Sequence, residues 1–209
     1  RQMCIRDRYQ FDETSGTAAF TPVSPLADGE HAISASVSDN NGNGAEDAVN
    51  FVVKTKAVKP VLDPLPHFVS ESAIAVSGAA EPGSLVKIFV NDIPAGTAVA
   101  DDTGRFSKEN VPLTPGMNTI TAEAQDSYGN VSDRSDPVQV GYDIAPPTAG
   151  NFSPVDGAVL NGIGSIGATI SDDLSGVAPD SIVMSLDGVQ VEATFADGTV
   201  SYTPAALNE

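Results

Sequence analysis

The sequence predicts an all-β chain of β-sandwiches, and three observations support this. Short runs rich in β-branched residues recur along the chain, such as Leu85–Val90 and Thr119–Ala124, and Gly, Pro, Asn or Asp bound them. No stretch shows the sustained 3.6-residue apolar period of a helix. The pairs Asp187-Gly188 and Asp197-Gly198 favour tight hairpin turns. Strands at this spacing, with no helices between them, are typical of sandwiches.

The composition excludes several classes of function. The chain has 28 Asp and Glu against 10 Lys and Arg, which gives a formal net charge of −18. A phosphate backbone needs a positive protein surface, so we expect no nucleic-acid partner. No apolar run approaches the ~20 residues of a membrane-spanning helix, so we expect no membrane insertion. A hydrophobic fraction of 41% with 18% charged residues argues against wholesale disorder.

The first eight residues, RQMCIRDR, differ from the rest of the chain. They hold three of the ten basic residues, one of the 28 acidic residues and the only cysteine. Met3–Asp7 resembles the translation of a sequencing adapter, so we expect residues 1–8 to be a non-native leader. The remaining 201 residues would then carry 7 basic and 27 acidic side chains, a net charge of −20. Such a chain has no thiol chemistry and no disulfide framework.

Internal repeats predict how the chain is divided. His31–Asn43 aligns without gaps on Asn118–Asn130, and in both an alternating strand runs into an Asp-x-x-Gly-Asn turn. A second correspondence joins the ends of the chain, since residues 15–22 resemble residues 197–204. We therefore predict an elongated array of tandem sandwiches, one complete and two truncated. Residues 9–57 would be the C-terminal part of one domain, 58–143 a complete domain, and 144–209 the N-terminal part of a third.

The middle segment carries a set of short motifs that together resemble a known family. The motifs are Val76-Ser77-Gly78 with Glu81-Pro82-Gly83, Asp102-x-Gly104-x-Phe106, Pro112-Leu113 with Gly116-x-Asn118, and Asp126-x-x-Gly129-Asn130. This set resembles bacterial immunoglobulin-like repeats of large secreted or surface-anchored proteins, including adhesins. The end segments resemble a related repeat type, through Ser153-Pro154-x-Asp156-Gly157 and Asp172-Asp173-Leu174-Ser175-Gly176.

The resemblance implies immunoglobulin-like domains that act as stalks on the bacterial cell surface. The implied partners are the neighbouring repeats of the same chain and, through a distal tip, a host or biofilm surface. Some repeats of this kind bind calcium between domains. The resemblance identifies no ligand.

The sequence does not predict an enzyme. His31 and His67 are the only histidines, and no nucleophile–His–Asp arrangement, phosphate-binding loop or HExxH motif is present. Paired acids at Asp101/Asp102 and Asp172/Asp173 lie in short turns, with no aromatic platform beside them for a sugar ring. We therefore expect no catalytic residues and no cofactor other than a metal ion.

Calcium is the predicted metal, because Ca²⁺ takes six to eight oxygen ligands and loops rich in Asp can supply them. In an ordinary immunoglobulin topology the B–C, D–E and F–G loops of residues 58–143 gather at the amino-terminal end, facing the connector that carries Asp63. The candidate ligands form two sets: Asp143, Asp172 and Asp173 at one joint, and Asp63, Asp101 and Asp126 at the other. The alternative is that these acids form turns and add solubilising charge.

A partial EF-hand pattern occurs at Asp39-x-Asn41-x-Asn43-Gly44. The bidentate Glu that the motif requires at position twelve is replaced by Asn50, and strands rather than helices flank the loop. We therefore interpret this segment as the turn of an F–G hairpin.

The leading hypothesis is a non-catalytic spacer segment of an extracellular bacterial adhesin-like repeat protein, stiffened by calcium at its domain joints. The alternative is a set of accessory modules in a secreted polysaccharide-degrading enzyme. A third hypothesis, direct sugar binding, would need exposed aromatic rings, and most of the 8 Phe and 4 Tyr occupy positions typical of a core.

Overall fold

The computed structural model describes residues 9–12, 14–162 and 164–204, and the predicted leader lies outside these ranges. Within them the regular structure is β-strand, apart from one 3-10 turn at Pro179–Ser181. The all-β prediction is confirmed. In the part of the chain that is described, no helix is long and apolar enough to cross a membrane.

The chain divides into two compact units between Ala57 and Val58. The first unit holds two antiparallel hairpins, β1 (Tyr9–Asp12) with β2 (Thr17–Phe20) and β3 (Gly29–Ser38) with β4 (Gly44–Val53). The second unit spans the rest of the chain. The predicted division of that unit near residue 143 stays a prediction, as does the assignment of the end segments to truncated domains.

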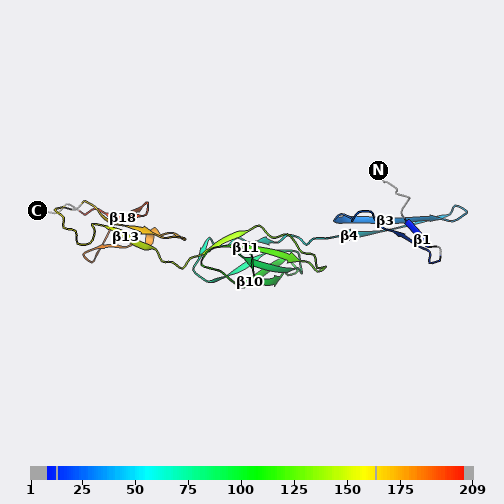
Figure 1. The fold of residues 1–209 in the computed structure, drawn as a ribbon, viewed down its shortest axis with the longest axis horizontal. Helices are drawn as coiled ribbons and strands as arrows, with labels where there is room; N and C mark the ends of the chain where they lie inside the picture. The colour runs from blue at the N-terminus through cyan, green and yellow to red at the C-terminus, as the bar shows by residue number, and fades with distance from the viewer. Residues whose placement is uncertain (1–8, 13, 163, 205–209) are drawn as a thin grey trace. The chain divides into compact units, whose positions relative to one another are not determined.

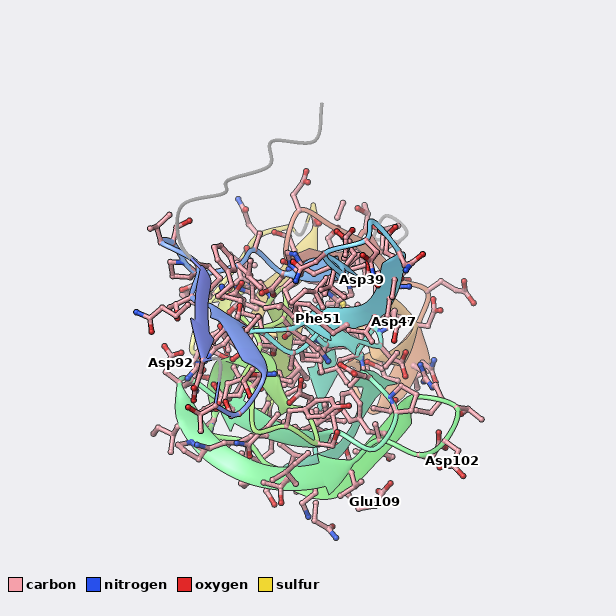
Figure 2. All side chains as sticks on the ribbon, turned by 90° about the vertical axis from the view of Figure 1, so that its right-hand side faces the viewer. Asp39, Asp47, Phe51, Asp92, Asp102 and Glu109 are labelled. Atoms are coloured by element: carbon pink, nitrogen blue, oxygen red, sulfur yellow. The ribbon has the colours of Figure 1, made fainter. Side chains whose placement is uncertain are left out.

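The turn of the long hairpin is closed by contacts of Asp39, and its assignment as an F–G turn stays a prediction. Asp39 caps it: one oxygen of its carboxylate accepts the backbone N–H groups of Asn41 and Asn43 at 2.9 and 2.8 Å, and the other accepts the Asn43 amide at 2.8 Å. Figure 2 shows Asp39 and Asp47 on this hairpin. The carboxylate of the partial EF-hand pattern is thus engaged by its own turn.

Residues 61–142 of the second unit form a two-layer sandwich, called here the middle domain. Its strands are β5 (Val61–Leu62), β6 (Phe68–Val69), β7 (Ala73–Ala79), β8 (Leu85–Val90), β9 (Ile93–Val99), β10 (Arg105–Pro112), β11 (Gly116–Gln125) and β12 (Val138–Tyr142). One sheet has the order β10-β7-β5 and the other β6-β12-β11-β8-β9. In Figure 1 the two layers are seen at β10 and β11.

The core lies between these two sheets. Strand β11 buries alternate residues, Ile120, Ala122 and Ala124, each with no exposed surface. They belong to one cluster with Val76 of β7 and Phe106 of β10 from the facing sheet. The period of two along β11 places every second side chain in the core, as the alternating pattern of the sequence requires.

The chain enters the middle domain at one end and leaves it at the other. Val61 pairs with Ala79 at the end of β7, whereas Tyr142 pairs with Gly116 at the start of β11. The far end of β11, at Gln125, pairs with Leu85 beside the entry loops. Entry and exit are therefore separated by the length of β11.

Strand β9 departs from the expected topology. It pairs with β8 in the five-stranded sheet instead of pairing with β10, so residues 101–104 connect the two sheets. The reason is local: Asn91 and Asp92, both at positive φ, make a two-residue turn that folds β9 directly back on β8.

The C-terminal segment contains a second, smaller set of sheets. Its strands are β13 (Thr148–Ser153), β14 (Ile166–Ser171), β15 (Met184–Leu186), β16 (Val189–Val191), β17 (Thr194–Ala196) and β18 (Thr199–Tyr202). One sheet has the order β13-β14-β18-β17, and β15 and β16 form a separate hairpin. Both predicted hairpin turns are confirmed, since Asp187-Gly188 and Asp197-Gly198 each join two paired strands with both residues at positive φ.

We expect two alanine substitutions at equivalent repeat positions to have very different effects. Ile120 is 0% exposed, and Ile33, its counterpart in the repeat, is 53% exposed. Ile120→Ala removes buried methyl groups and should lower the free energy of unfolding of the middle domain by about 2–5 kcal/mol. Ile33→Ala should change the free energy of unfolding of the first unit, to which Ile33 belongs, by less than about 0.5 kcal/mol. Urea denaturation followed by circular dichroism measures both, and equal losses would contradict the described core.

Candidate functional site

The amino-terminal end of the middle domain brings together three predicted loops. Ala80 N–H donates to Gly104 O at 2.9 Å, and Gly83 N–H donates to Ala100 O at 3.0 Å, so the first loop is tied to the second. The third loop begins after Gln125, which pairs with Leu85. The sequence correctly placed the loops of residues 81–84, 101–104 and 126–130 at one end.

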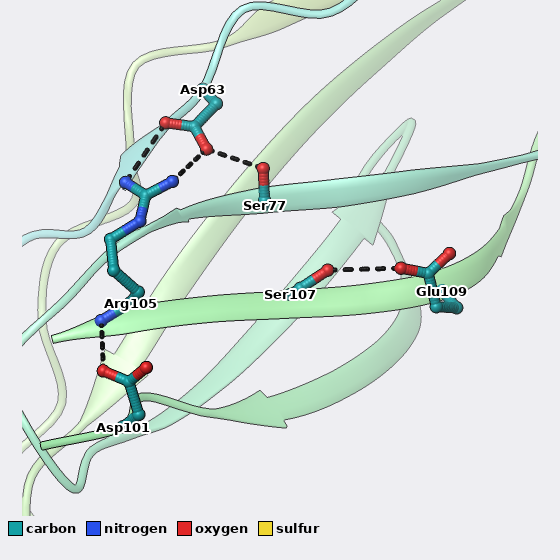
Figure 3. Close-up of polar contacts among 6 residues, drawn as sticks. All are labelled: Asp63, Ser77, Asp101, Arg105, Ser107 and Glu109. Carbon is teal, nitrogen blue, oxygen red and sulfur yellow. Dashed lines mark hydrogen bonds and ion pairs between the residues drawn. The ribbon is translucent and has the colours of Figure 1, made fainter. Parts of the chain in front are cut away.

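At this end the connector carboxylate of Asp63 contacts a cation from the protein itself. Both terminal nitrogens of the Arg105 guanidinium donate to Asp63, Nη1 to Oδ1 at 3.3 Å and Nη2 to Oδ2. Ser77 Oγ donates to Oδ2 at 2.6 Å (Figure 3). These contacts hold the pKa of Asp63 below its usual value, Arg105 first and Ser77 second. The connector is thereby attached to β7 and β10.

Asp101 and Asp126 are engaged in their own turns. Asp101 Oδ1 accepts the Thr103 hydroxyl at 2.6 Å and the Arg105 backbone N–H at 3.0 Å, which lowers the pKa of Asp101. Asp126 is nearly buried, and its Oδ1 accepts the backbone N–H groups of Tyr128 and Asn130 at 3.0 and 2.9 Å. These contacts are the turn-forming role that the sequence left open as the alternative to calcium. Calcium binding by Asp63, Asp101 and Asp126 stays a prediction.

The turn of Asp126 repeats that of Asp39 bond for bond. In both, the Asp N–H donates to the carbonyl of the Asn four residues later, at 3.0 and 2.9 Å. In both, the Asn amide donates to the second carboxylate oxygen, at 3.1 Å for Asn130 and 2.8 Å for Asn43. The turns of the two segments that align without gaps therefore have the same hydrogen bonds.

The second predicted joint lies where the middle domain leads into the C-terminal segment. Asp143 Oδ2 accepts the Ser175 N–H at 2.9 Å. Hydrogen bonds from Ser175, the side chain first and the backbone second, lower the pKa of Asp143. Asp172 Oδ1 accepts the N–H groups of Leu174 and Gly176 at 3.1 and 2.7 Å. The structure thus brings Asp143 and Asp172 to the same short loop, while Asp173 is exposed beside them.

Among the described residues, no three His, Cys, Asp or Glu side chains are grouped as a metal site would group them. The two histidines lie elsewhere, His31 against Phe51 with ring centroids 5.5 Å apart and His67 exposed in the connector. The residue that the sequence analysis missed is Arg105. Its signal was available, because it is one of few basic residues and directly follows the Asp-Asp-Thr-Gly turn.

Removal of the Asp63 charge should make the middle domain less stable only at pH values at which the Asp63 carboxyl is ionised. The pKa of Asp63 in the fold lies below 3.8. Its stabilising contribution is therefore complete above pH 3.8 and is lost as the pH falls through the lower folded value. Asp63→Asn should lower the urea midpoint at neutral pH, and the gap to the wild type should close in acid.

Asp102→Asn is the matched control, because Asp102 is exposed in the adjacent turn. It should leave the midpoint unchanged at both pH values. A gap between Asp63→Asn and the wild type that is the same in acid and at neutral pH would show that the Asp63–Arg105 pair does not stabilise the domain.

Comparison with protein families matches residues 63–140 to the bacterial Ig domain, and comparison with curated proteins found no match. A domain of a biofilm-associated protein is 24% identical over 62% of this chain and 21% of its own length, with a TM-score of 0.35. A tetra-tandem repeat from the extending region of a large adhesion protein is 22% identical over 94% of this chain and 57% of its own, also at 0.35. The fibronectin(III)-like modules of Clostridium thermocellum CbhA are 19% identical over 61% of this chain and 72% of theirs, at 0.34.

The chain spans about a fifth of the first of these structures and 57% of the second. The family match covers the described two-sheet sandwich from the Asp63 connector into β12. Residues 63–140 therefore combine a two-sheet sandwich with a match to the bacterial Ig domain.

Proposed function

We propose that this chain is a non-catalytic spacer segment of an extracellular bacterial adhesin-like repeat protein. The observation that carries the proposal is the path of the chain through the middle domain. A spacer must receive the chain at one end and release it at the other, so that each domain adds its own length to the array.

The parallel pairing of β6 with β12 supplies this path. Gly141 N–H donates to His67 O at 2.8 Å, and Asp143 N–H donates to Val69 O at 2.9 Å. Since a strand near the start of the domain and its last strand run in the same direction side by side, the chain continues onward instead of turning back. Tension along the chain acts parallel to these strands, so it loads their hydrogen bonds together.

The partners in this proposal are the neighbouring immunoglobulin-like repeats, and the location is the bacterial cell surface. A distal tip on the full protein would contact a host or biofilm surface. Many weak contacts at such a tip gain strength from multivalent display, which a long stalk permits. The net charge of −18 keeps repeated segments of the stalk apart in solution.

Calcium at the joint of Asp143, Asp172 and Asp173 is part of the proposal. The shared loop at Leu174–Gly176 already holds Asp143 and Asp172, so a cation bound there would tie the middle domain to the segment that follows. A divalent cation would also relieve the repulsion between these carboxylates.

The alternative, an accessory module of a polysaccharide-degrading enzyme, would use the same spacer geometry. The gene sequence on either side separates the two: further repeats and a secretion signal favour the adhesin, and a catalytic domain favours the enzyme.

Direct sugar binding would need exposed aromatic rings, and more rings are exposed than the sequence predicted. Exposed rings occur at Phe20, Phe51, Phe68, Tyr128 and Phe152, so the expectation that most aromatics are core residues is wrong. Three of the five lie in the end segments, whose sheets are small. On the outer face of the five-stranded sheet Phe89 is buried, with the Arg134 guanidinium carbon 3.7 Å from its ring centroid.

A distance measurement tests the spacer geometry. Cysteines introduced at the exposed positions Val58 and Ile144, in a Cys4→Ser chain, would carry spin labels at the two ends of the middle domain. We expect a separation of about 33 Å or more, the length of the ten residues of β11. A separation less than half that value would mean that entry and exit lie together, and the spacer proposal would be wrong.

A second measurement tests calcium at the joint. Melting of the full chain in Ca²⁺ and in chelator should show a higher midpoint with Ca²⁺ for the C-terminal segment. Asp172→Asn should remove this shift, while Asp180→Asn, at an exposed acid of the same segment, should keep it. An unchanged midpoint together with no binding heat at millimolar Ca²⁺ would contradict calcium binding and leave the spacer geometry standing.

A further inference from the structure

A row of three residues crosses the outer face of the five-stranded sheet at the end where the chain leaves the middle domain. Met117 of β11 pairs with Gly141 of β12, and Gly141 pairs in turn with Phe68 of β6. The next residues along β11 and β6, Asn118 and Val69, face the core, so Met117 and Phe68 face away from it. Met117 is 51% exposed and Phe68 is 40% exposed. The row therefore begins and ends at an exposed apolar side chain.

Gly141 allows these two side chains to approach each other. A Cβ at Gly141 would meet Phe68 Cδ1 at 2.5 Å and Met117 Sδ at 3.3 Å, so the ring and the thioether occupy the space that a side chain at this position would fill. Gly141 is itself buried, although it lies on the same outer face. Contacts between a thioether and an aromatic ring are favourable. Phe68 and Met117 therefore form an apolar cover over the backbone of Gly141.

This cover protects the attachment of β6. Strand β6 is two residues long, and its parallel pairing with β12 joins Phe68 to Gly141 and Val69 to Tyr142. The Gly141 N–H donates to His67 O at 2.8 Å. Water competes less well for a backbone hydrogen bond that apolar groups surround. Because the pairing is so short, a change in the cover should change its stability.

Met117 and Met184 hold the only sulfur atoms of residues 9–209, because the remaining methionine and the cysteine lie in residues 1–8. Met184, on β15, is partly buried, whereas half of Met117 is exposed. Peroxides oxidise an accessible thioether to a sulfoxide, which turns an apolar side chain into a polar and chiral one. Of these two sulfur atoms, that of Met117 is the more accessible.

We propose that Met117 is an oxidation site at which a two-electron oxidant such as hydrogen peroxide loosens β6 from β12. The peroxide transfers one oxygen atom to the sulfur and leaves as water, the sulfur is oxidised by two electrons, and no bond of the chain breaks. The sulfoxide group is more stable in water than against the Phe68 ring, so the cover over Gly141 opens. Sulfoxide reductases restore the thioether, so the change is reversible.

The oxidation goes beyond the spacer role and does not depend on it. Where tension acts along β6 and β12, as in the spacer proposal, oxidation would weaken the strand pair that bears it. Failure of the oxidation test would leave the spacer geometry standing, because that geometry is tested by the distance between the two ends of the middle domain.

Peptide mass mapping of the full chain after treatment with hydrogen peroxide tests the site. A Cys4→Ser chain keeps thiol oxidation out of the measurement. We expect one oxygen atom to be added at Met117 before Met184 in the folded chain. In concentrated urea, where both side chains are exposed, the two rates should become nearly equal.

Amide hydrogen exchange of the same samples tests the effect on β6. Loss of a sulfur–aromatic contact should make exchange of the Gly141 N–H about 2- to 10-fold faster in the sulfoxide form. Exchange of the Ala80 N–H, which donates to Gly104 O at the opposite end of the domain, should not change.

Three variants separate the sulfur atom from the apolar cover. Met117→Leu keeps an apolar side chain, so peroxide should no longer alter exchange at Gly141. Met184→Leu is the matched control and should keep the full response. Met117→Gln places a polar group over Gly141 and should speed exchange there before any oxidant is added. Circular dichroism and the melting of the middle domain establish that each variant is folded.

Three results would overturn the proposal. Oxidation of Met117 no faster than that of Met184 in the folded chain would show that Met117 is not the reactive site. Unchanged exchange at Gly141 in the fully oxidised chain would show that the cover does not hold β6. Equal acceleration at Ala80 would show that oxidation destabilises the whole domain rather than this strand pair.

Discussion

Burial of one side of β11 is the interaction on which the middle domain depends. Ile120, Ala122 and Ala124 have no exposed surface, and they pack against side chains of the facing sheet. Because β11 also pairs with β8 on one edge and β12 on the other, its position sets the register of the whole five-stranded sheet. A shift of β11 by one residue would turn all three side chains to solvent.

The path of the chain follows from that register. With β12 held on β11, β6 can add in parallel only where β12 permits a close approach, and Gly141 permits it. A Cβ at Gly141 would meet Phe68 Cδ1 at 2.5 Å, so any larger residue would displace the Phe68 ring. Gly78 has the same role within the three-stranded sheet, where a Cβ would meet the Val61 carbonyl of the β5 strand and Phe106 Cζ of β10, the latter at 2.7 Å. Two glycines thus allow the strands that carry the chain from end to end.

Several acidic side chains of the chain form short-range contacts in turns. The carboxylates of Asp39, Asp101, Asp126 and Asp172 each accept backbone N–H groups of the turn that follows them, which satisfies donors that the turn would otherwise leave to water. Asp63 differs, because its partner Arg105 is 42 residues away. This pair joins the connector to the domain, and it places a protein cation where a metal ion had been considered.

The sequence by itself determined the features that depend on neighbouring residues. The all-β class, the bounds of β8, the tight turns at Asp187-Gly188 and Asp197-Gly198, and the capped turns at Asp39 and Asp126 all follow from local backbone preference and side-chain alternation. Only the tertiary structure decided that β9 joins β8, that Arg105 meets Asp63, and that Ile120 is buried while Ile33 is exposed. The reason is that pairing and burial depend on which distant strands are present. Two segments with the same local pattern therefore do not show which of them will be buried.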